Sequence, residues 1–149
     1  MLSVIIDARS GAGGLPGLLA QLTAGAIDGV VRQVLIVAAA GQPGIDVLCE
    51  DMGAEACPSI PAAARAARAD RVLLVAADFR LRDGWIAALD GHIGAGGGQA
   101  VVAGLKTGGV FARTPTGFLV ERGLLEQVAD DVDLPRVRRI LGLRGRGIG

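Results

Sequence analysis

Residues 62–85 read AAARAARADRVLLVAADFRLRDGW and decide the fold, because a helix, a buried strand and a carboxylate follow one another here without a break. Alanine and arginine are strong helix formers, which predicts a helix over 62–69 that ends at Asp70. Residues 72–75 are all apolar and have the length of a strand buried on both faces of a parallel sheet. Asp78 follows at the carboxyl end of this strand, where open α/β sheets bind ligands. The stretch predicts an α/β protein in which Asp78 is either a site residue or a loop-capping residue.

Outward from this stretch, apolar runs alternate with helical patterns. The predicted strands are 2–6, 33–40, 55–58 at an edge, and 99–105. The predicted helices are 15–26, 45–52, 84–93 and 121–128, and a hairpin-like pair is predicted at 108–112 and 116–119. This alternation is typical of a three-layer α/β/α sandwich with a mostly parallel central sheet. At 149 residues, the chain has the size of a single domain spanning 1–149.

Composition excludes several classes of protein. Lys and Arg number 15, as do Asp and Glu, so the zero net charge gives no general attraction to nucleic acid or to an anionic membrane. Hydrophobic residues make up 51% and charged residues 20%, which excludes a disordered chain and is compatible with self-association into a homo-oligomer. No apolar run of about 18 residues is present, so we expect a cytoplasmic protein with neither a membrane span nor a signal peptide.

The cysteines and the histidine indicate no metal site. Cys49 and Cys57 lack the close spacing of a metal knuckle, and we expect both to be reduced. His92 has no second His or Cys near it in sequence, so we expect it to be solvated or locally hydrogen-bonded.

A glycine-rich segment follows the first strand and its terminal Asp7. Glycines at the start of a helix let backbone N–H groups approach an anion, as in phosphate cradles. A P-loop is excluded because the only lysine of the chain is Lys106, and a dinucleotide site needs an acidic residue where residues 38–40 are all alanine. The segment also resembles the glycine-rich first loop of nucleotidyltransferases, which carries basic residues for a triphosphate, but only Arg9 is available here. We therefore expect an ordinary tight turn.

The late part of the chain places three carboxylates before a basic helix. The carboxylates are Asp130, Asp131 and Asp133, and the arginines are Arg136, Arg138 and Arg139. Carboxylates this close repel one another unless they are hydrated, protonated or joined to a cation. The segment is interpreted either as a solvated turn that caps the last helix near Pro135 or as a catalytic motif.

The strand, Asp78, Arg80-Leu81 and Gly84-Trp85 resemble the nucleotide-sugar core of family 2 glycosyltransferases. In that family, the last Asp of a motif at the end of this strand binds the divalent metal that carries the sugar diphosphate. The resemblance implies Asp78 as a ligand of Mg²⁺ or Mn²⁺. Ala76 stands at the first acidic position of the family motif, which is a departure from the commoner pattern.

The acidic turn resembles the late motif of the same family, in which an acidic pair precedes a short arginine-rich helix. There an Asp accepts the proton of the acceptor hydroxyl, which is a weak nucleophile until that proton is removed. The resemblance implies Asp131 as general base, with Asp130 adjusting its pKa through like-charge coupling.

The resemblance also implies a nucleotide-sugar donor, with contacts from Asp7, Arg9, Asp46 and Arg139. Asp46 is alternatively a cap at the start of its helix. Two nucleotide contacts of the family are missing, because Gly11 and Ala39 with its neighbours stand where the family has acidic residues. Arg144 and Arg146 in the tail are candidates to close over the diphosphate.

The implied function is metal-dependent transfer of a sugar from a nucleotide-diphospho-sugar to an acceptor hydroxyl. Two alternatives stay open. One is a binding or assembly module that keeps the fold without catalysis, and the other is a small nucleotidyltransferase, against which the scarcity of lysine argues. If sugar transfer is the function, Asp78 and Asp131 must converge on one cleft.

Overall fold

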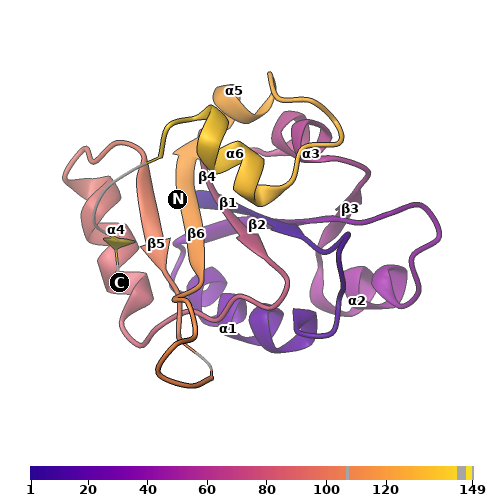
Figure 1. Ribbon diagram of the computed structural model, residues 1–149, viewed down its shortest axis with the longest axis horizontal. Coiled ribbons are helices and arrows are strands. Elements are labelled where there is room, and N and C mark those ends of the chain that lie inside the picture. Colours follow the sequence, from indigo (N-terminus) through magenta and orange to yellow (C-terminus); the bar gives the residue numbers. More distant parts are fainter. Residues whose placement is uncertain (107, 144–146, 149) are drawn as a thin grey trace.

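The computed structural model describes residues 1–106, 108–143 and 147–148 (Figure 1). Within them, seven strands form one sheet in the order β3-β2-β1-β4-β6-β5-β7. The strands are β1 (Leu2–Asp7), β2 (Val31–Val37), β3 (Glu55–Cys57), β4 (Arg71–Ala76), β5 (Ala100–Ala103), β6 (Thr116–Glu121) and β7 (Gly147–Ile148). All neighbours are parallel except β6, which runs antiparallel to both β4 and β5. The prediction of a mostly parallel sheet is confirmed.

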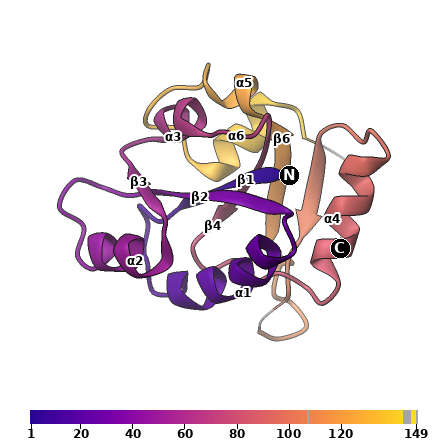
Figure 2. The ribbon, with the colours of Figure 1, turned by 180° about the vertical axis from the view of Figure 1, so that it is seen from behind.

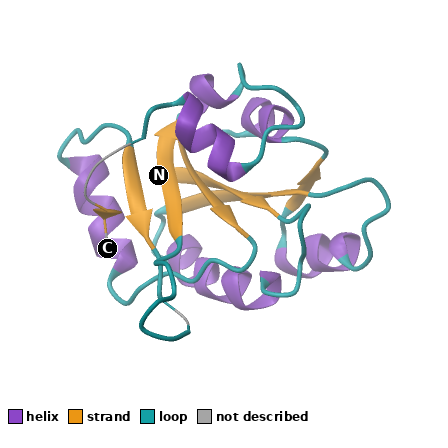
Figure 3. Cartoon of the chain, viewed as in Figure 1, coloured by secondary structure: helices purple, strands orange, loops and turns teal. Residues whose placement is uncertain are grey.

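Helices cover both faces of the sheet, as Figures 1 and 2 show from opposite sides. They are α1 (Leu15–Ile27), α2 (Ile45–Met52), α3 (Ile60–Ala66), α4 (Trp85–Gly94), α5 (Arg122–Leu125) and α6 (Leu134–Ile140). Apolar residues of α1, α2 and α4 form one core cluster with the sheet, and those of α3, α5 and α6 form the other. The three-layer α/β/α sandwich is therefore confirmed (Figure 3).

Strand β4 lies at the centre because its side chains are apolar on both faces. Leu73 and Val75 belong to the core with α1, whereas Val72 and Leu74 belong to the core with α3. All four side chains are fully buried. Each apolar side contributes to a different core, which fixes the register of the strand against its neighbours.

The helix before β4 begins and ends earlier than its alanine content predicts. Helix α3 starts after Ser59, whose hydroxyl accepts a 3.2 Å hydrogen bond from the Ala62 N–H and caps the helix. It ends at Ala66 because the next N–H groups bind buried polar side chains: Arg68 N donates to Gln33 and Ala69 N donates to Ser3. Tertiary hydrogen bonds thus override helix propensity here.

Elsewhere the predicted elements agree with the structure to within a few residues, and two predictions are wrong. Residues 108–112 form no strand. Strand β6 therefore forms no hairpin with residues 108–112 and pairs with β4 and β5 instead. The backbone of Gly108 has φ +106°, which does not fit a pleated strand. Strand β2 ends at Val37, so residues 38–40 lie in the connection that follows it.

No helix among the described residues is both long enough and apolar enough to span a membrane.

Candidate functional site

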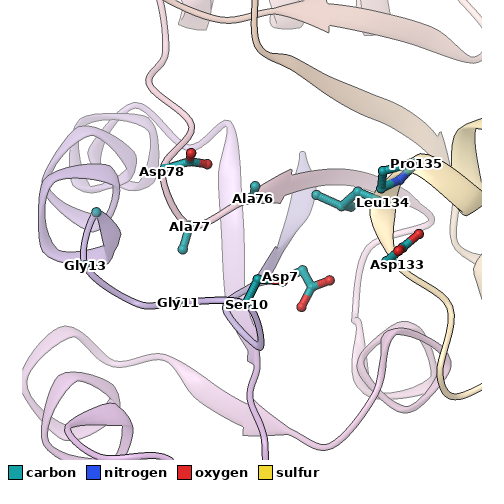
Figure 4. Close-up of a pocket in the computed structure, with 11 residues that line it drawn as sticks. Asp7, Ser10, Gly11, Gly13, Ala76, Ala77, Asp78, Asp133, Leu134 and Pro135 are labelled. Atoms are coloured by element: carbon teal, nitrogen blue, oxygen red, sulfur yellow. The ribbon is translucent and has the colours of Figure 1, made fainter. Parts of the chain in front are cut away.

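The candidate site is a pocket at the carboxyl ends of β1 and β4. Parallel strands end at the same edge, so residues after each strand meet there. The pocket has a volume of about 520 Å³. Figure 4 shows its walls. They are formed by Asp7, Ser10, Gly11, Gly13, Gly14, Ala76, Ala77, Asp78, Asp133, Leu134 and Pro135.

Asp78 lies in this pocket, as predicted from its place after the strand. Its side chain is exposed, and none of the described residues donates a hydrogen bond to its carboxylate. The next residue, Phe79, is only 1% exposed and packs in the core with Leu81. Burial of Phe79 fixes the backbone at this point and leaves the Asp78 carboxylate facing the pocket.

Asp7 and Arg9 form an ion pair. The Arg9 guanidinium donates to both carboxylate oxygens of Asp7, at 2.9 Å from Nε and 3.0 Å from a terminal nitrogen. The Asp7 side chain is 8% exposed and that of Arg9 is 21% exposed. The hydrogen bond that Arg9 donates to Asp7 raises the pKa of Arg9 above its ordinary value. The two side chains predicted to contact a nucleotide are therefore bound to each other.

Arg9 also holds the acidic turn. Its guanidinium donates to the backbone carbonyl of Asp130 at 3.0 Å and to that of Val132 at 2.6 Å. These bonds join the loop after β1 to the segment before α6. Arg9 thereby places the start of α6 beside the pocket, a role for which the sequence carries no signal.

The glycine-rich loop packs closely against the segment that carries Asp78. A Cβ atom at Gly14 would lie 2.9 Å from the Ala77 carbonyl oxygen and 2.9 Å from the Asp78 Cα. Arg80 donates a 2.6 Å hydrogen bond to the Gly14 carbonyl. The close approach of these two backbone segments explains why residue 14 is a glycine, and no phosphate ligand is needed to explain it. This agrees with the prediction of an ordinary tight turn.

The acidic turn contributes Asp133 to the pocket. Asp133 is the N-cap of α6, where one of its carboxylate oxygens accepts a 3.0 Å hydrogen bond from Arg136 N. In Figure 4 it lies across the pocket from Asp78. The capping interpretation is thus correct for Asp133, and its presence in the pocket was not foreseen.

Asp130 and Asp131, the predicted catalytic pair, lie elsewhere. Asp131 lines a different depression, together with Arg136 and Arg139. The Asp130 carboxylate accepts a 3.4 Å hydrogen bond from the Ser59 hydroxyl. The expected convergence of Asp78 with Asp131 is therefore not found, because Arg9 holds this turn by its backbone carbonyls and Val132, between Asp131 and Asp133, is buried.

The remaining predicted nucleotide contacts are also outside the main pocket. Asp46 lies exposed in the first turn of α2 and lines a pocket of about 260 Å³ with Ala39 and Ala40. The N-cap of α2 is Gly44, so Asp46 is not the cap. Arg139 is exposed on α6. Arg144 and Arg146 lie outside the described residues.

The main pocket offers few protein ligands to a divalent cation. The part of the chain that the structure describes has no group of three or more His, Cys, Asp or Glu side chains arranged to hold a metal ion. Mg²⁺ often uses only one or two protein carboxylates and completes its octahedron with phosphate oxygens and water. The exposed Asp78 meets that lesser requirement.

Comparison with solved structures identifies the fold. No protein-family model matches the chain, and no curated protein matches it in sequence. Glucosyl-3-phosphoglycerate synthase from Mycobacterium tuberculosis, solved with Mn²⁺, UDP and glucosyl-3-phosphoglycerate, superposes with a TM-score of 0.60 at 15% identity over 84% of this chain and 58% of that one. Mannosyl-3-phosphoglycerate synthase from Rubrobacter xylanophilus gives 0.60 at 18% identity, over 83% and 54%. The fold is that of the nucleotide-diphospho-sugar transferases.

A synthase of similar length to this chain shares the fold. A 4-diphosphocytidyl-2C-methyl-D-erythritol synthase superposes with a TM-score of 0.61 at 17% identity, over 96% of this chain and 86% of the synthase. By contrast, this chain spans little more than half the length of the glucosyl- and mannosyl-3-phosphoglycerate synthases. At these identities the comparisons show the fold alone, so the reaction has to be inferred from the site.

Proposed function

We propose that this protein binds a nucleotide-diphospho-sugar together with a divalent cation and transfers the sugar to an acceptor hydroxyl. The observation that carries the proposal is the exposed carboxylate of Asp78 at the carboxyl end of the central strand, in a pocket of about 520 Å³. Solved structures of this fold include one that holds Mn²⁺ and UDP, which supports a donor of this kind.

Asp78 is the residue proposed to hold the cation. Mg²⁺ or Mn²⁺, when bound there with the diphosphate, neutralises charge on the leaving group. The main pocket is also lined by Ser10, Gly11 and Gly13. A Cβ atom at either glycine would meet no atom within 4 Å, so the space beside this backbone is open. Donor phosphates therefore have room beside Asp78.

Asp133 is the residue we propose to accept the proton of the acceptor hydroxyl. It lines the same pocket as Asp78, whereas Asp131 does not. One of its oxygens caps α6, and none of the described residues donates a hydrogen bond to the other. A proton acceptor must reach the hydroxyl within hydrogen-bond distance, so a place in the pocket is the first requirement. Asp131 with Asp130 stays the competing assignment.

Ligand-dependent thermal unfolding tests donor binding. UDP with Mn²⁺ at about 100 times its Kd stabilises the native state by about 2.7 kcal/mol, which raises Tm by roughly 5–10 °C. UDP-, GDP- and CDP-linked sugars then identify the nucleotide. Asp78→Asn is expected to abolish the Mn²⁺-dependent part of the shift, while Asp83→Asn, a matched change on the exposed surface outside the pocket, leaves it unchanged. An undiminished shift in Asp78→Asn removes Asp78 from the site.

A binding module without turnover is the second candidate. The observation that favours it is the Asp7–Arg9 ion pair, which engages the Asp7 carboxylate that lines the pocket. Residues 38–40, all alanine, add no polar side chain at the end of β2. Binding of a nucleotide-sugar without sugar release or transfer, over a panel of alcohol and phosphate-ester acceptors, selects this alternative.

A further inference from the structure

We propose that Arg138 and Arg139 bind the phosphate group of a phosphorylated acceptor, in a second pocket that adjoins the candidate site. This pocket has a volume of about 380 Å³ and is lined by Pro135, Arg138, Arg139, Gly142 and Leu143. Pro135 also lines the main pocket. The inference rests on the proposed function, and it names the class of acceptor for the same site.

The two arginines are free to take an anion. Their side chains are exposed, and no carboxylate of the described chain pairs with either one. Two other arginines near the main pocket are committed: Arg9 to Asp7, and Arg80 to the carbonyl of Gly14. Guanidinium groups bind phosphate through paired hydrogen bonds, and two of them in one pocket suit a dianionic phosphate monoester.

The position of the second pocket favours the acceptor over the donor. Asp78, the proposed cation ligand, lies on one side of the main pocket, and Asp133, Leu134 and Pro135 lie on the other (Figure 4). The donor diphosphate belongs beside Asp78. Pro135 lines both pockets, so an anion bound by Arg138 and Arg139 lies next to the side of the main pocket that carries Asp133, the proposed proton acceptor.

A purely structural role for these arginines makes a different prediction. Both lie in the last turn of α6, which ends at Ile140; Leu141 is its C-cap, and Gly142 follows in the left-handed conformation with φ +61°. Cations at a helix C-terminus stabilise the helix through its dipole. That role predicts a lower Tm on substitution and no dependence of phosphate binding on either arginine.

The test measures binding of glycerol 3-phosphate by calorimetry, with glycerol as the control ligand and UDP–Mn²⁺ titrated in parallel. Arg138→Gln is expected to weaken the binding of glycerol 3-phosphate about tenfold or more, because a charge-assisted hydrogen bond is lost. The affinity for UDP–Mn²⁺ is expected to stay unchanged. Arg136→Gln is the matched control, since it removes the same charge from the same helix and Arg136 does not line the second pocket. Arg138→Lys keeps the charge without the planar fork and is expected to bind with intermediate affinity.

The outcomes separate this inference from the proposed function. Equal weakening by Arg136→Gln and Arg138→Gln, or equal weakening of UDP–Mn²⁺ by Arg138→Gln, overturns the acceptor site. Binding of UDP–Mn²⁺ without binding of glycerol 3-phosphate also overturns it and leaves sugar transfer in place. A third outcome is that glycerol 3-phosphate binds through Arg138 while no nucleotide-sugar binds. That outcome supports the phosphate site and contradicts the proposed nucleotide-sugar donor.

Discussion

The guanidinium of Arg9 donates a 2.6 Å hydrogen bond to the backbone carbonyl of Val132, which lies 123 positions further along the chain. Together with the ion pair to Asp7, this bond joins the loop after β1 to the start of α6. It determines which carboxylate of the acidic turn lies in the pocket. A residue predicted to hold a phosphate thus serves to assemble the site.

Arg9→Met is therefore expected to destabilise the protein. The change leaves the carboxylate of Asp7, 8% exposed, without its cation and the Val132 carbonyl without its donor, which costs about 2–3 kcal/mol. Urea unfolding measures the loss. Arg68→Met is the control, because its 3.7 Å pair with Glu55 is exposed and contributes at most about 1 kcal/mol. Equal, small losses in both variants contradict the role assigned to Arg9.

Asp133→Asn separates the capping role from the chemical role. Asn is as good an N-cap as Asp, so the free energy of unfolding is expected to change by less than about 0.5 kcal/mol. Removal of a positioned base lowers the rate of transfer by roughly 100-fold or more. Asp131→Asn, which changes a carboxylate outside the pocket, is compared in the same assay. A rate loss confined to Asp131→Asn returns the general base to Asp131.

Gly14→Ala is expected to displace Asp78. The added Cβ would lie 2.9 Å from both the Ala77 carbonyl oxygen and the Asp78 Cα, so one backbone segment must move. We expect lower stability together with a weaker Mn²⁺-dependent shift. Gly123→Ala in α5 meets no atom within 4 Å and is expected to be neutral or stabilising by up to about 1 kcal/mol. An unchanged metal response in Gly14→Ala contradicts the close packing described here.

The two phenylalanines at the same end of the sheet are expected to behave differently. Phe79→Ala removes a side chain that is 1% exposed and costs about 3–5 kcal/mol, with loss of the backbone anchor next to Asp78. Phe111→Ala removes one that is 99% exposed and is expected to change stability by less than about 0.5 kcal/mol. Chemical denaturation of both variants makes the comparison, and similar losses at the two positions contradict the burial difference.

Thiol reactivity is expected to depend on pH in a predictable direction. Burial raises the pKa of both Cys49 and Cys57, with further contributions from Asp46 and Glu55 respectively. Each thiol is then less ionised than a free cysteine at a given pH, so alkylation by iodoacetamide is slower at neutral pH. Since the fold favours the protonated thiol, this stabilisation is full below the ordinary thiol pKa and is lost as pH rises through the raised pKa. Mass spectrometry of labelled protein from pH 7 to 10 measures the rates, and labelling at neutral pH as fast as that of N-acetylcysteine contradicts the shift.

Elements with a strong local pattern were predicted well. Helix α2 has the predicted bounds of 45–52, and β4 extends the predicted strand by one residue at each end. Helix α5 is shorter than predicted, with the bounds Arg122–Leu125, and residues 108–112 are not a strand. Sequence patterns specify what a segment prefers by itself. They do not specify which neighbour a short strand such as β6 pairs with, since that depends on contacts across the chain.

By itself, the sequence determined the α/β/α architecture and the place of Asp78, because hydrophobic period and helix propensity act over a few neighbouring residues. Only the tertiary structure decided that Asp133, and not Asp131, shares the pocket with Asp78. That choice depends on Arg9, whose hydrogen bonds reach carbonyls more than a hundred positions away. Backbone carbonyls are the same in every residue, so no pattern of side chains in the sequence marks the ones that Arg9 binds.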